Sequence, residues 1–491
     1  FMMRPVVLGN VVSLSLRGMS LMPLTLMSLS LMGMLTAQVH AEQPTYFRSD
    51  RGLAGADDRP LPEKFDEPAN LVWSQPVAPG HSSPCVHGDA IYLTTFHEGK
   101  LATISLDKKT GTVNWSREAP AEKIEPFHAT GSPASATPAC DGQRVYSFFG
   151  SYGVLCYDLE GKLLWQKPLG PFQDEFGAAS SPVLVGDKLL LNEDHDINSF
   201  LICIDAKTGA TVWQTMRPGF TRSYATPVVW ERDGEPTQVI VAGALQLTSY
   251  DLQSGKPLWT VDGLARIVNA TPTMDQQRLY VGSWSPGGDS DSRISMEPWK
   301  AAVQKWDENQ DGKLTQKEVD NKDVLDRFFR IDLNQDQALD QAEWEKYALV
   351  FELARNSLMA IKPTGKEASA PEIDWQIDKG IPYIASPLLY REHLFIVKEG
   401  GIVSSVDVAS GKTMKQGRVR GGGNYYASPV AGDGKLYLIN EAGVLSVVRA
   451  AGAWELLSSH DFAERTMATP AIVDGRIYVR TEKRLYCFAK P

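Results

Sequence analysis

A dipeptide of Ser or Thr followed by Pro recurs along this chain, and each copy opens a short apolar segment. The eight copies are Ser83-Pro84, Thr137-Pro138, Ser181-Pro182, Thr226-Pro227, Thr271-Pro272, Ser386-Pro387, Ser428-Pro429 and Thr469-Pro470. Successive prolines are 54, 44, 45, 45, 115, 42 and 41 residues apart, so the fifth unit carries about seventy extra residues. A repeat of one length indicates similar units that stack on one another, which constrains the fold more than any local motif does.

Each unit carries the signals of four short strands. A Pro-led strand is followed by an Asp/Gly turn and then by an alternating apolar strand, as at 278–282. A third strand ends in an Asp-x-x-Ser/Thr-Gly turn, and four residues after its Gly stands Trp115, Trp165, Trp213 or Trp259. Alternation is typical of half-buried strands, and Asp and Gly suit tight turns. The pattern predicts an all-β fold, an eight-bladed β-propeller with four-stranded blades.

The two ends of the chain are expected to close the ring. The last unit, 468–489, contains only three strands, and Leu71-Val72-Trp73 supplies a fourth strand with its Trp. Two blades are irregular, because Lys415 replaces the expected Trp in the sixth and Trp454 follows a shortened turn in the seventh.

These repeats resemble the PQQ-like (pyrrolo-quinoline quinone) repeat family over residues 69–491, apart from the extra residues of the fifth unit. The family includes quinoprotein alcohol dehydrogenases and non-enzymatic propellers such as the outer-membrane-assembly protein BamB. Tyr46-Phe47-Arg48 and Asn70-Leu71-Val72-Trp73 resemble exported members of this family. The resemblance implies a propeller that either binds the quinone PQQ or serves as a scaffold.

The extra residues of the fifth unit contain a twelve-residue motif of calcium-binding EF-hand loops, 307–318. Gly312 stands where the loop needs a positive φ, and Lys313 would offer only its carbonyl oxygen. The predicted ligands are Asp307, Asn309, Asp311, Lys313, Thr315 and Glu318. A solvated acidic turn is the alternative interpretation.

A second motif of this kind begins twenty-five residues after the first. Its predicted ligands are Asp332, Asn334, Asp336, Ala338, Asp340 and Glu343. Gln337 occupies the position of the expected Gly, in a backbone region that costs a non-Gly residue roughly 1 kcal/mol. We therefore expect weaker calcium binding here, or a second loop that is structural and free of metal.

The EF-hand pair is assigned to residues 298–356, inserted between the second and third strands of its blade. Helices are expected at Pro298–Trp306, Val324–Ile331 and Glu343–Leu353. Between Trp299 and Arg355 stand thirteen acidic and nine basic residues, a net charge of −4 that calcium would reduce. Because the insertion shares a face with the connections between blades, we expect it to lie over one mouth of the central channel, as a lid or a partner arm.

The first 41 residues indicate export. Arg4 precedes an apolar stretch from about Leu21 to Leu35, and small residues before Glu42 fit a signal-peptidase site. The prediction is a signal peptide at 1–41, a linker at 42–68 and a periplasmic or secreted chain that does not span the membrane. A membrane anchor is the alternative, but Pro23 and several Ser residues interrupt a short run.

Charge and cysteine content narrow the functional classes. The net charge of −10 offers no basic stripe for phosphates, so nucleic acid is not an expected partner. The five cysteines form no C-x-x-C or haem-attachment motif. Each falls in an apolar strand, which favours buried thiols over a disulfide.

Three functional hypotheses remain. The favoured one is a non-enzymatic scaffold that binds an envelope protein or polysaccharide, with calcium as its only expected cofactor and no catalytic residue assigned. The alternative is a PQQ-dependent dehydrogenase, which lacks here the adjacent-cysteine disulfide that the resemblance implies for that branch. The third is calcium-gated opening of the channel.

A metal site of His97, Asp194 and His195 is conceivable but not favoured. The residues expected on the binding face are His128, Asp174, Glu175, Asp194, His195, Asp196, Arg222, Tyr224, Arg266, Tyr383, Arg420, Tyr425, Tyr426 and Arg465.

Overall fold

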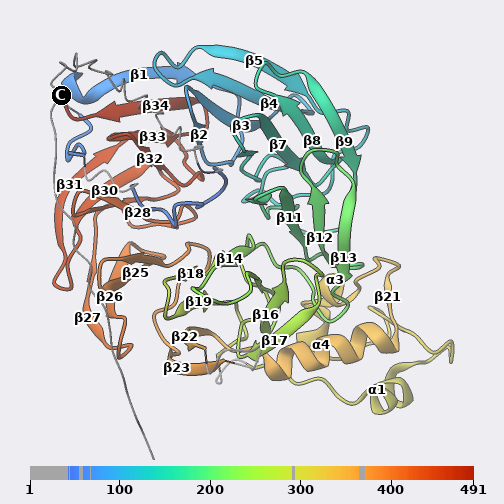
Figure 1. Ribbon diagram of the computed structural model, residues 1–491. Helices are drawn as coiled ribbons and strands as arrows, with labels where there is room; N and C mark the ends of the chain where they lie inside the picture. Colours follow the sequence, from blue (N-terminus) through green and yellow to red (C-terminus); the bar gives the residue numbers. More distant parts are fainter. Residues whose placement is uncertain (1–42, 44, 55–58, 67, 290–292, 364–370) are drawn as a thin grey trace, which may run out of the picture. The chain divides into compact units, whose positions relative to one another are not determined.

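Eight antiparallel sheets of four strands each follow one another around a ring in the computed structural model (Figure 1). The structure describes residues 43, 45–54, 59–66, 68–289, 293–363 and 371–491, so the predicted signal segment 1–41 lies outside it. Each sheet is one blade, and the first strands of most neighbouring blades lie side by side at the inner edge of the ring. The all-β, eight-bladed propeller with four-stranded blades is confirmed.

Blades one to four follow the chain without interruption. Their strands are β2 (Cys85–His87), β3 (Ala90–His97), β4 (Lys100–Asp107) and β5 (Val113–Glu118); β6 (Ala139–Cys140), β7 (Arg144–Phe149), β8 (Gly153–Asp158) and β9 (Leu163–Pro168); β10 (Val183–Val185), β11 (Lys188–Glu193), β12 (Phe200–Asp205) and β13 (Thr211–Met216); and β14 (Val228–Trp230), β15 (Gln238–Ala242), β16 (Gln246–Asp251) and β17 (Pro257–Asp262).

Blades five to eight include one interrupted sheet and one closing sheet. Their strands are β18 (Thr273–Met274), β19 (Leu279–Ser283), β22 (Ser357–Lys362) and β23 (Glu372–Ile377); β24 (Leu388–Tyr390), β25 (His393–Lys398), β26 (Ile402–Asp407) and β27 (Thr413–Arg418); β28 (Val430–Gly432), β29 (Lys435–Ile439), β30 (Val444–Arg449) and β31 (Glu455–Asp461); and β32 (Ala471–Val473), β33 (Arg476–Arg480), β34 (Arg484–Ala489) and β1 (Leu71–Pro76). A short 3-10 turn, Pro68–Asn70, precedes β1. Because β1 pairs with β34, the two ends of the propeller close one blade, as predicted.

Tryptophans on the fourth strands of several blades pack against the next blade. The indole Nε1 of Trp115 donates to the carbonyl of Leu159 in the following blade at 2.8 Å, and Trp165 donates to Ala206 at 3.1 Å. Gly161 lies against the Trp115 ring, and a Cβ there would come within 2.6 Å of it. The Gly of each turn therefore leaves room for the Trp of the preceding blade.

The irregular blades replace this contact with another. Lys415 extends its ammonium to the carbonyl of Trp454 and lies 4.6 Å from the centre of that indole ring. In the fifth blade the packing Trp is Trp375 on β23, which donates to Val408 of the next blade at 2.9 Å. The repeat pattern did not mark Trp375, because no Asp-x-x-Ser/Thr-Gly turn ends four residues before it.

The hydrophobic core consists of layers between neighbouring blades. Phe148 and Val154 of the second blade, for example, pack with Leu189 and Ile202 of the third. All five cysteine side chains are buried in the strands, as the buried-thiol interpretation expected.

A helical insertion lies between β19 and β22 of the fifth blade. It contains α1 (Trp299–Trp306), β20 (Leu314–Thr315), α2 (Lys322–Leu325), α3 (Phe328–Ile331), β21 (Ala338–Leu339) and α4 (Gln341–Leu353). It has its own core, which includes Phe328 and Trp344. The middle helix, predicted at Val324–Ile331, is instead two short helices. It begins earlier than predicted because the Asn321 side chain caps α2 by accepting from the backbone N–H groups of 323 and 324.

Candidate functional site

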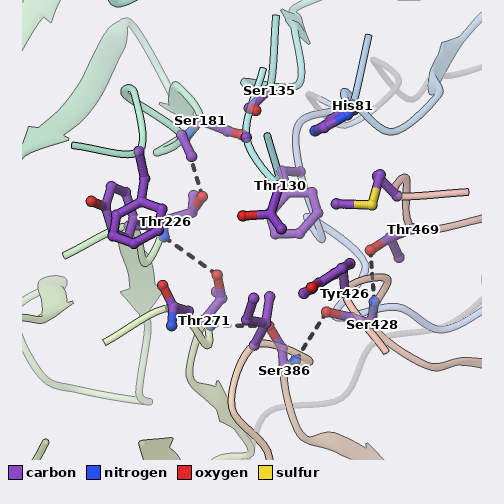
Figure 2. Close-up of a pocket in the computed structure, with 18 of the residues that line it drawn as sticks. His81, Thr130, Ser135, Ser181, Thr226, Thr271, Ser386, Tyr426, Ser428 and Thr469 are labelled. Carbon is purple, nitrogen blue, oxygen red and sulfur yellow. Dashed lines mark hydrogen bonds between the residues drawn. The ribbon is translucent and has the colours of Figure 1, made fainter. Parts of the chain in front are cut away.

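The Ser and Thr of the repeated dipeptide form a ring of hydrogen bonds around the central channel. In each bond a hydroxyl oxygen accepts from the backbone N–H of the equivalent residue in the preceding blade. Seven such bonds of 2.9–3.3 Å join Ser83, Thr137, Ser181, Thr226, Thr271, Ser386, Ser428 and Thr469 in succession. Figure 2 shows part of this hydroxyl ring. The repeat that dominates the sequence is therefore the contact that sets the spacing of blades at the axis.

One end of the channel is crossed by the segment 45–54. Thr45 pairs with Cys140 of the second blade, and Leu53 pairs with Ala431 of the seventh. Between them, Arg48 donates to the carbonyls of Pro387 at 3.0 Å and Pro429 at 3.2 Å. Residues predicted as part of a linker thus tie together blades on both sides of the ring, and we call them the N-terminal strap.

A cavity of about 360 Å³ lies in the channel, bounded by the hydroxyl ring and by Phe47 of the strap. Twenty-four of the described residues line it, and none of them is Asp, Glu, Lys or Arg. This volume is in the range of small-molecule sites in proteins. We call this cavity the channel pocket.

Aromatic and neutral polar side chains from the blade connections line the rest of the channel pocket. Phe176 and Tyr224 meet edge to face at 6.0 Å between ring centres. Asn269 donates to the carbonyl of Tyr383 at 3.1 Å. Burial, with the charges of Arg480 and Arg465, lowers the pKa of His81 to about 3, so this imidazole is neutral at physiological pH.

A buried acidic group lies directly behind Tyr224. The tyrosine hydroxyl donates to Asp174 Oδ1 at 2.6 Å, and Asp174 Oδ2 lies 4.0 Å from His195 Nδ1. On the other side of the imidazole, Nε2 is 3.0 Å from Glu193 Oε2. Glu125 completes the group, and within the described chain none of the three carboxylates lies within salt-bridge distance of a Lys or Arg. We call Glu125, Asp174, Glu193 and His195 the acidic cluster.

Desolvation controls the protonation of the acidic cluster. Burial, reinforced by the charge of Asp196, raises the pKa of Asp174 to about 7. Burial and the charge of Asp174 raise the pKa of Glu125 to about 8. Burial lowers the pKa of His195 to about 3, so the ring is neutral and cannot offset the carboxylates. The cluster therefore holds protons near neutral pH.

The structure brings only some of the predicted face residues to the channel pocket. Those that line it are His128, Tyr224, Tyr383 and Tyr426. Arg222 and Asp196 form a buried ion pair, Asp194 pairs with buried Arg217, and Tyr425 is buried. Arg465 pairs with Glu441, Arg266 donates to Pro286, and Arg420 is exposed.

His97 is exposed while His195 is buried, so the conceived metal site of His97, Asp194 and His195 does not form. Sequence reasoning missed His81 and Asn269, which no spacing distinguishes.

The insertion contacts two blade connections rather than the channel. Arg330 of α3 lies 3.3 Å from Glu175, and Lys346 of α4 donates to the carbonyl of Pro218 at 3.0 Å. Gln173 also donates to the carbonyl of Leu333. None of the insertion's described residues lines the channel pocket, and its expected position over the mouth, as a lid or partner arm, stays a prediction. The helix α4 runs almost directly into β22 and packs on Leu245 of the fourth blade.

The two predicted loops of the insertion have closely similar backbones. Gln310 and Gly312 in the first, and Gln335 and Gln337 in the second, have φ values of 59°, 77°, 60° and 71°. The strands β20 and β21 pair the loops through Leu314 and Leu339.

Equivalent hydrogen bonds organise both loops. Asp307 Oδ2 accepts from the N–H of Gly312 at 2.9 Å, and Asp332 Oδ2 accepts from the N–H of Gln337 at 2.8 Å. The oxygen-rich side chains suit a hard cation such as calcium. Across residues 43, 45–54, 59–66, 68–289, 293–363 and 371–491, however, no three His, Cys, Asp or Glu side chains are already gathered as a metal site.

The family described as "Outer membrane protein assembly factor BamB" matches residues 47–197 and 197–323, more than half of the chain. The chain belongs to the BamB family. As a member of that family it has a propeller built from the same repeat, interrupted here by the helical insertion.

Two solved structures share the fold of this BamB-family chain. BamB from Moraxella catarrhalis has 13% identity and a TM-score of 0.54, over 86% of this chain and 99% of that one. The computationally designed Ika8 protein has 8% identity and a TM-score of 0.53, over 86% and 100%. A europium-containing methanol dehydrogenase has 10% identity and a TM-score of 0.43, over 86% and 93%. No curated protein sequence is significantly similar.

Proposed function

We propose that this chain is an exported, calcium-binding propeller that acts as a non-enzymatic binding and assembly scaffold in the cell envelope. The observation that carries the proposal is membership of the BamB family, over a fold that also matches a BamB structure. A closed ring of eight blades is rigid, so its loop face can present fixed contacts to a partner.

The insertion is proposed to be an EF-hand pair. Its first loop would offer side-chain oxygens of Asp307, Asn309, Asp311, Thr315 and Glu318 and the carbonyl of Lys313. Its second would offer Asp332, Asn334, Asp336, Asp340 and Glu343 and the carbonyl of Ala338. The shared backbone of the two loops and their pairing through β20 and β21 support this assignment. Bound calcium supplies positive charge to a segment whose net charge is −4.

One contact predicts a difference between the loops. Lys313 of the first loop lies 2.7 Å from Asp336, a proposed ligand of the second. A cation in the second loop competes with this ion pair, so the first loop is expected to bind calcium more tightly.

The residues of the channel do not fit PQQ, which was the alternative. PQQ is a polycarboxylate, and burying its charges requires cationic or metal partners. The described lining of the channel pocket offers neither Lys nor Arg, nor a carboxylate that could hold a metal beside the quinone. We therefore derive no oxidation chemistry through PQQ.

Location in the envelope, in the periplasm or secreted, is part of the proposal. It rests on the family and on the predicted signal at 1–41. No helix in the described part of the chain is long and apolar enough to cross a membrane.

The scaffold role is tested by deleting the gene in its host and measuring the abundance of outer-membrane proteins. A fall that the wild-type chain restores supports the role. Unchanged abundance contradicts it.

Titration of the purified chain with PQQ is expected to show no uptake, and tight uptake with alcohol oxidation would replace the scaffold by an enzyme.

Calcium binding is tested separately by calorimetry on the chain without its signal segment. Glu318→Gln is expected to remove the tighter site and Glu343→Gln the weaker one. The exposed Glu308, which occupies a non-ligand position of the first loop, provides the control Glu308→Gln. Binding that survives both ligand substitutions would show that the insertion is not an EF-hand pair.

A further inference from the structure

We infer that the channel pocket binds an uncharged, hydroxyl-rich ligand, a neutral saccharide unit of an envelope glycan. The inference deepens the proposed scaffold function, because it names the chemistry of one partner. It rests on the lining of the channel pocket, the hydrogen-bond state of the hydroxyl ring and the strap that closes the channel.

The described lining of the channel pocket contains no Asp, Glu, Lys or Arg, and two nearby arginines are engaged elsewhere. Arg480 donates to the carbonyls of Ser82 and Thr94, and Arg465 pairs with Glu441. A charged ligand would lose its hydration in this pocket without gaining an ion-pair partner, whereas a neutral ligand avoids that cost.

The hydroxyl ring has unused hydrogen-bonding capacity. Seven of the eight hydroxyl oxygens accept a backbone N–H, and none of the eight hydroxyls donates to another described residue. Each therefore has a proton to donate into the channel. Asn269 uses its amide N–H₂ on Tyr383, which leaves its carbonyl oxygen able to accept. Donors and acceptors together complement the hydroxyl groups of a sugar.

Aromatic side chains line part of the channel pocket. Phe176, Tyr224, Tyr383 and Tyr426 all line it and are only partly buried. Trp284 meets Tyr383 edge to face at 5.4 Å, which holds that ring in place. The face of a sugar ring carries C–H groups that pack on such surfaces, while its hydroxyls point outward to polar groups. A small apolar ligand would leave the hydroxyl ring unsatisfied.

The N-terminal strap makes the channel pocket blind at one end. Phe47 lies at that end, and Arg48 and the two backbone bridges hold the strap across the ring. A glycan chain cannot pass through a channel closed in this way. The ligand is therefore the end of a chain or a short side branch, which enters from the side of the blade connections.

The test is calorimetric titration of the purified chain with three neutral tetrasaccharides, of β-linked glucose, α-linked glucose and β-linked N-acetylglucosamine, and with acidic tetragalacturonate. At least one neutral probe is expected to bind with a Kd of about 1 mM or tighter, and tetragalacturonate about tenfold more weakly or not at all. Tyr383→Ala and Tyr426→Ala are each expected to weaken neutral binding by about tenfold. The exposed Phe329 of α3, outside the pocket, provides the control Phe329→Ala.

A charge-inserting variant keeps the test decisive if an alanine variant fails to fold. Met467→Lys puts a cation into the lining, so it should weaken neutral binding and strengthen tetragalacturonate binding. Three results overturn the inference: no neutral probe bound up to about 10 mM, tetragalacturonate bound at least as tightly as the neutral probes, or neutral binding unaffected by all three pocket variants.

Failure of the scaffold role is distinguishable from failure of this inference. The scaffold role fails when deletion leaves outer-membrane proteins unchanged, even if the purified chain binds saccharide. The saccharide inference fails in calorimetry, even if the deletion phenotype is present and is restored by Tyr383→Ala.

Discussion

Gln337 shows how far a single residue can depart from a motif without changing the backbone. Its φ of 71° is close to the 77° of Gly312 at the same position of the first loop. A side chain in this region carries a steric penalty that Gly does not. The second loop therefore holds strain that the first loop avoids, while both keep the same hydrogen bond to the first Asp.

Replacing this residue should relieve the strain. Gln337→Gly is expected to tighten calcium binding in the second loop about fivefold, the equivalent of about 1 kcal/mol. The reverse change, Gly312→Gln, should weaken the first loop by a similar factor. Calorimetric titration of both variants checks this, and equal affinities for wild type and Gln337→Gly would show that the strain has no effect on binding.

The acidic cluster gives a second prediction for single residues, concerning pH. The folded-state pKa values of Glu125, about 8, and Asp174, about 7, lie above the ordinary value near 4. The folded state therefore binds more protons than the unfolded state between these limits. The contribution of these two carboxyl groups to the free energy of unfolding is fully present below about pH 4 and is lost as the pH rises to about 8.

Glu125→Gln should make this loss smaller, because the amide stays neutral. The free energy of unfolding, measured with urea from pH 5 to 8, is expected to fall less steeply in the variant than in wild type. Glu118 is exposed and paired with Lys100, so Glu118→Gln should leave the slope unchanged. A slope unaltered by Glu125→Gln would mean that this carboxyl does not hold its proton in the folded state.

At the scale of elements, the contact between a Trp and the Gly of the next blade explains why the turn sequence recurs. Gly209 has a φ of 76°, and a Cβ there would lie 2.7 Å from the Trp165 ring. Gly186 also has a positive φ, of 57°, but a Cβ there would meet no atom within 4 Å. The two glycines share a backbone requirement and differ only in packing.

This difference can be measured. Gly209→Ala is expected to lower the free energy of unfolding by about 2–4 kcal/mol, from backbone strain together with a steric clash. Gly186→Ala should cost only about 1 kcal/mol, from strain alone. Urea unfolding of the two variants checks this, and equal losses would show that the Trp165 ring can move aside.

The sequence predicts elements better than it predicts the site. The eight Ser/Thr-Pro copies and the closing strand at 71–73 were recognisable because a propeller repeats local patterns at nearly constant spacing. The channel pocket was only partly recognisable. His81 and Asn269 carry no motif, and Glu125 joins Asp174 and Glu193 only through folding of separate blades. Asp194 was mistaken for a surface group, since its charge alone does not reveal that it pairs with Arg217, twenty-three residues away.

At the scale of the whole molecule, the N-terminal strap links blades that are far apart in the chain. Arg48 donates to carbonyls of the sixth and seventh blades, and Arg51 donates to Met274 of the fifth at 2.8 Å. The strap therefore adds cross-links between blades that are not neighbours in the ring.

Removing the partly buried guanidinium of Arg48 should loosen the strap. Arg48→Ala leaves the backbone carbonyls of Arg51, Pro387 and Pro429 without this donor, a loss of about 2 kcal/mol, so amide exchange of residues 45–53 should become faster. Arg51→Ala removes one exposed contact and should have a smaller effect. Hydrogen-exchange mass spectrometry checks both, and unchanged exchange in Arg48→Ala would mean that the backbone bridges hold the strap alone.

The position of the insertion has a consequence for how such a ring acquires new parts. Ser283 and Ser357, where the chain leaves and re-enters the fifth blade, pair directly in the sheet, and the Thr271-to-Ser386 bond at the axis is 3.0 Å, like its counterparts elsewhere. The ring thus closes as though nothing had been added. A hairpin tip of this kind is an insertion site. A module whose two ends lie one strand spacing apart can be accommodated there while the eight blades stay unchanged.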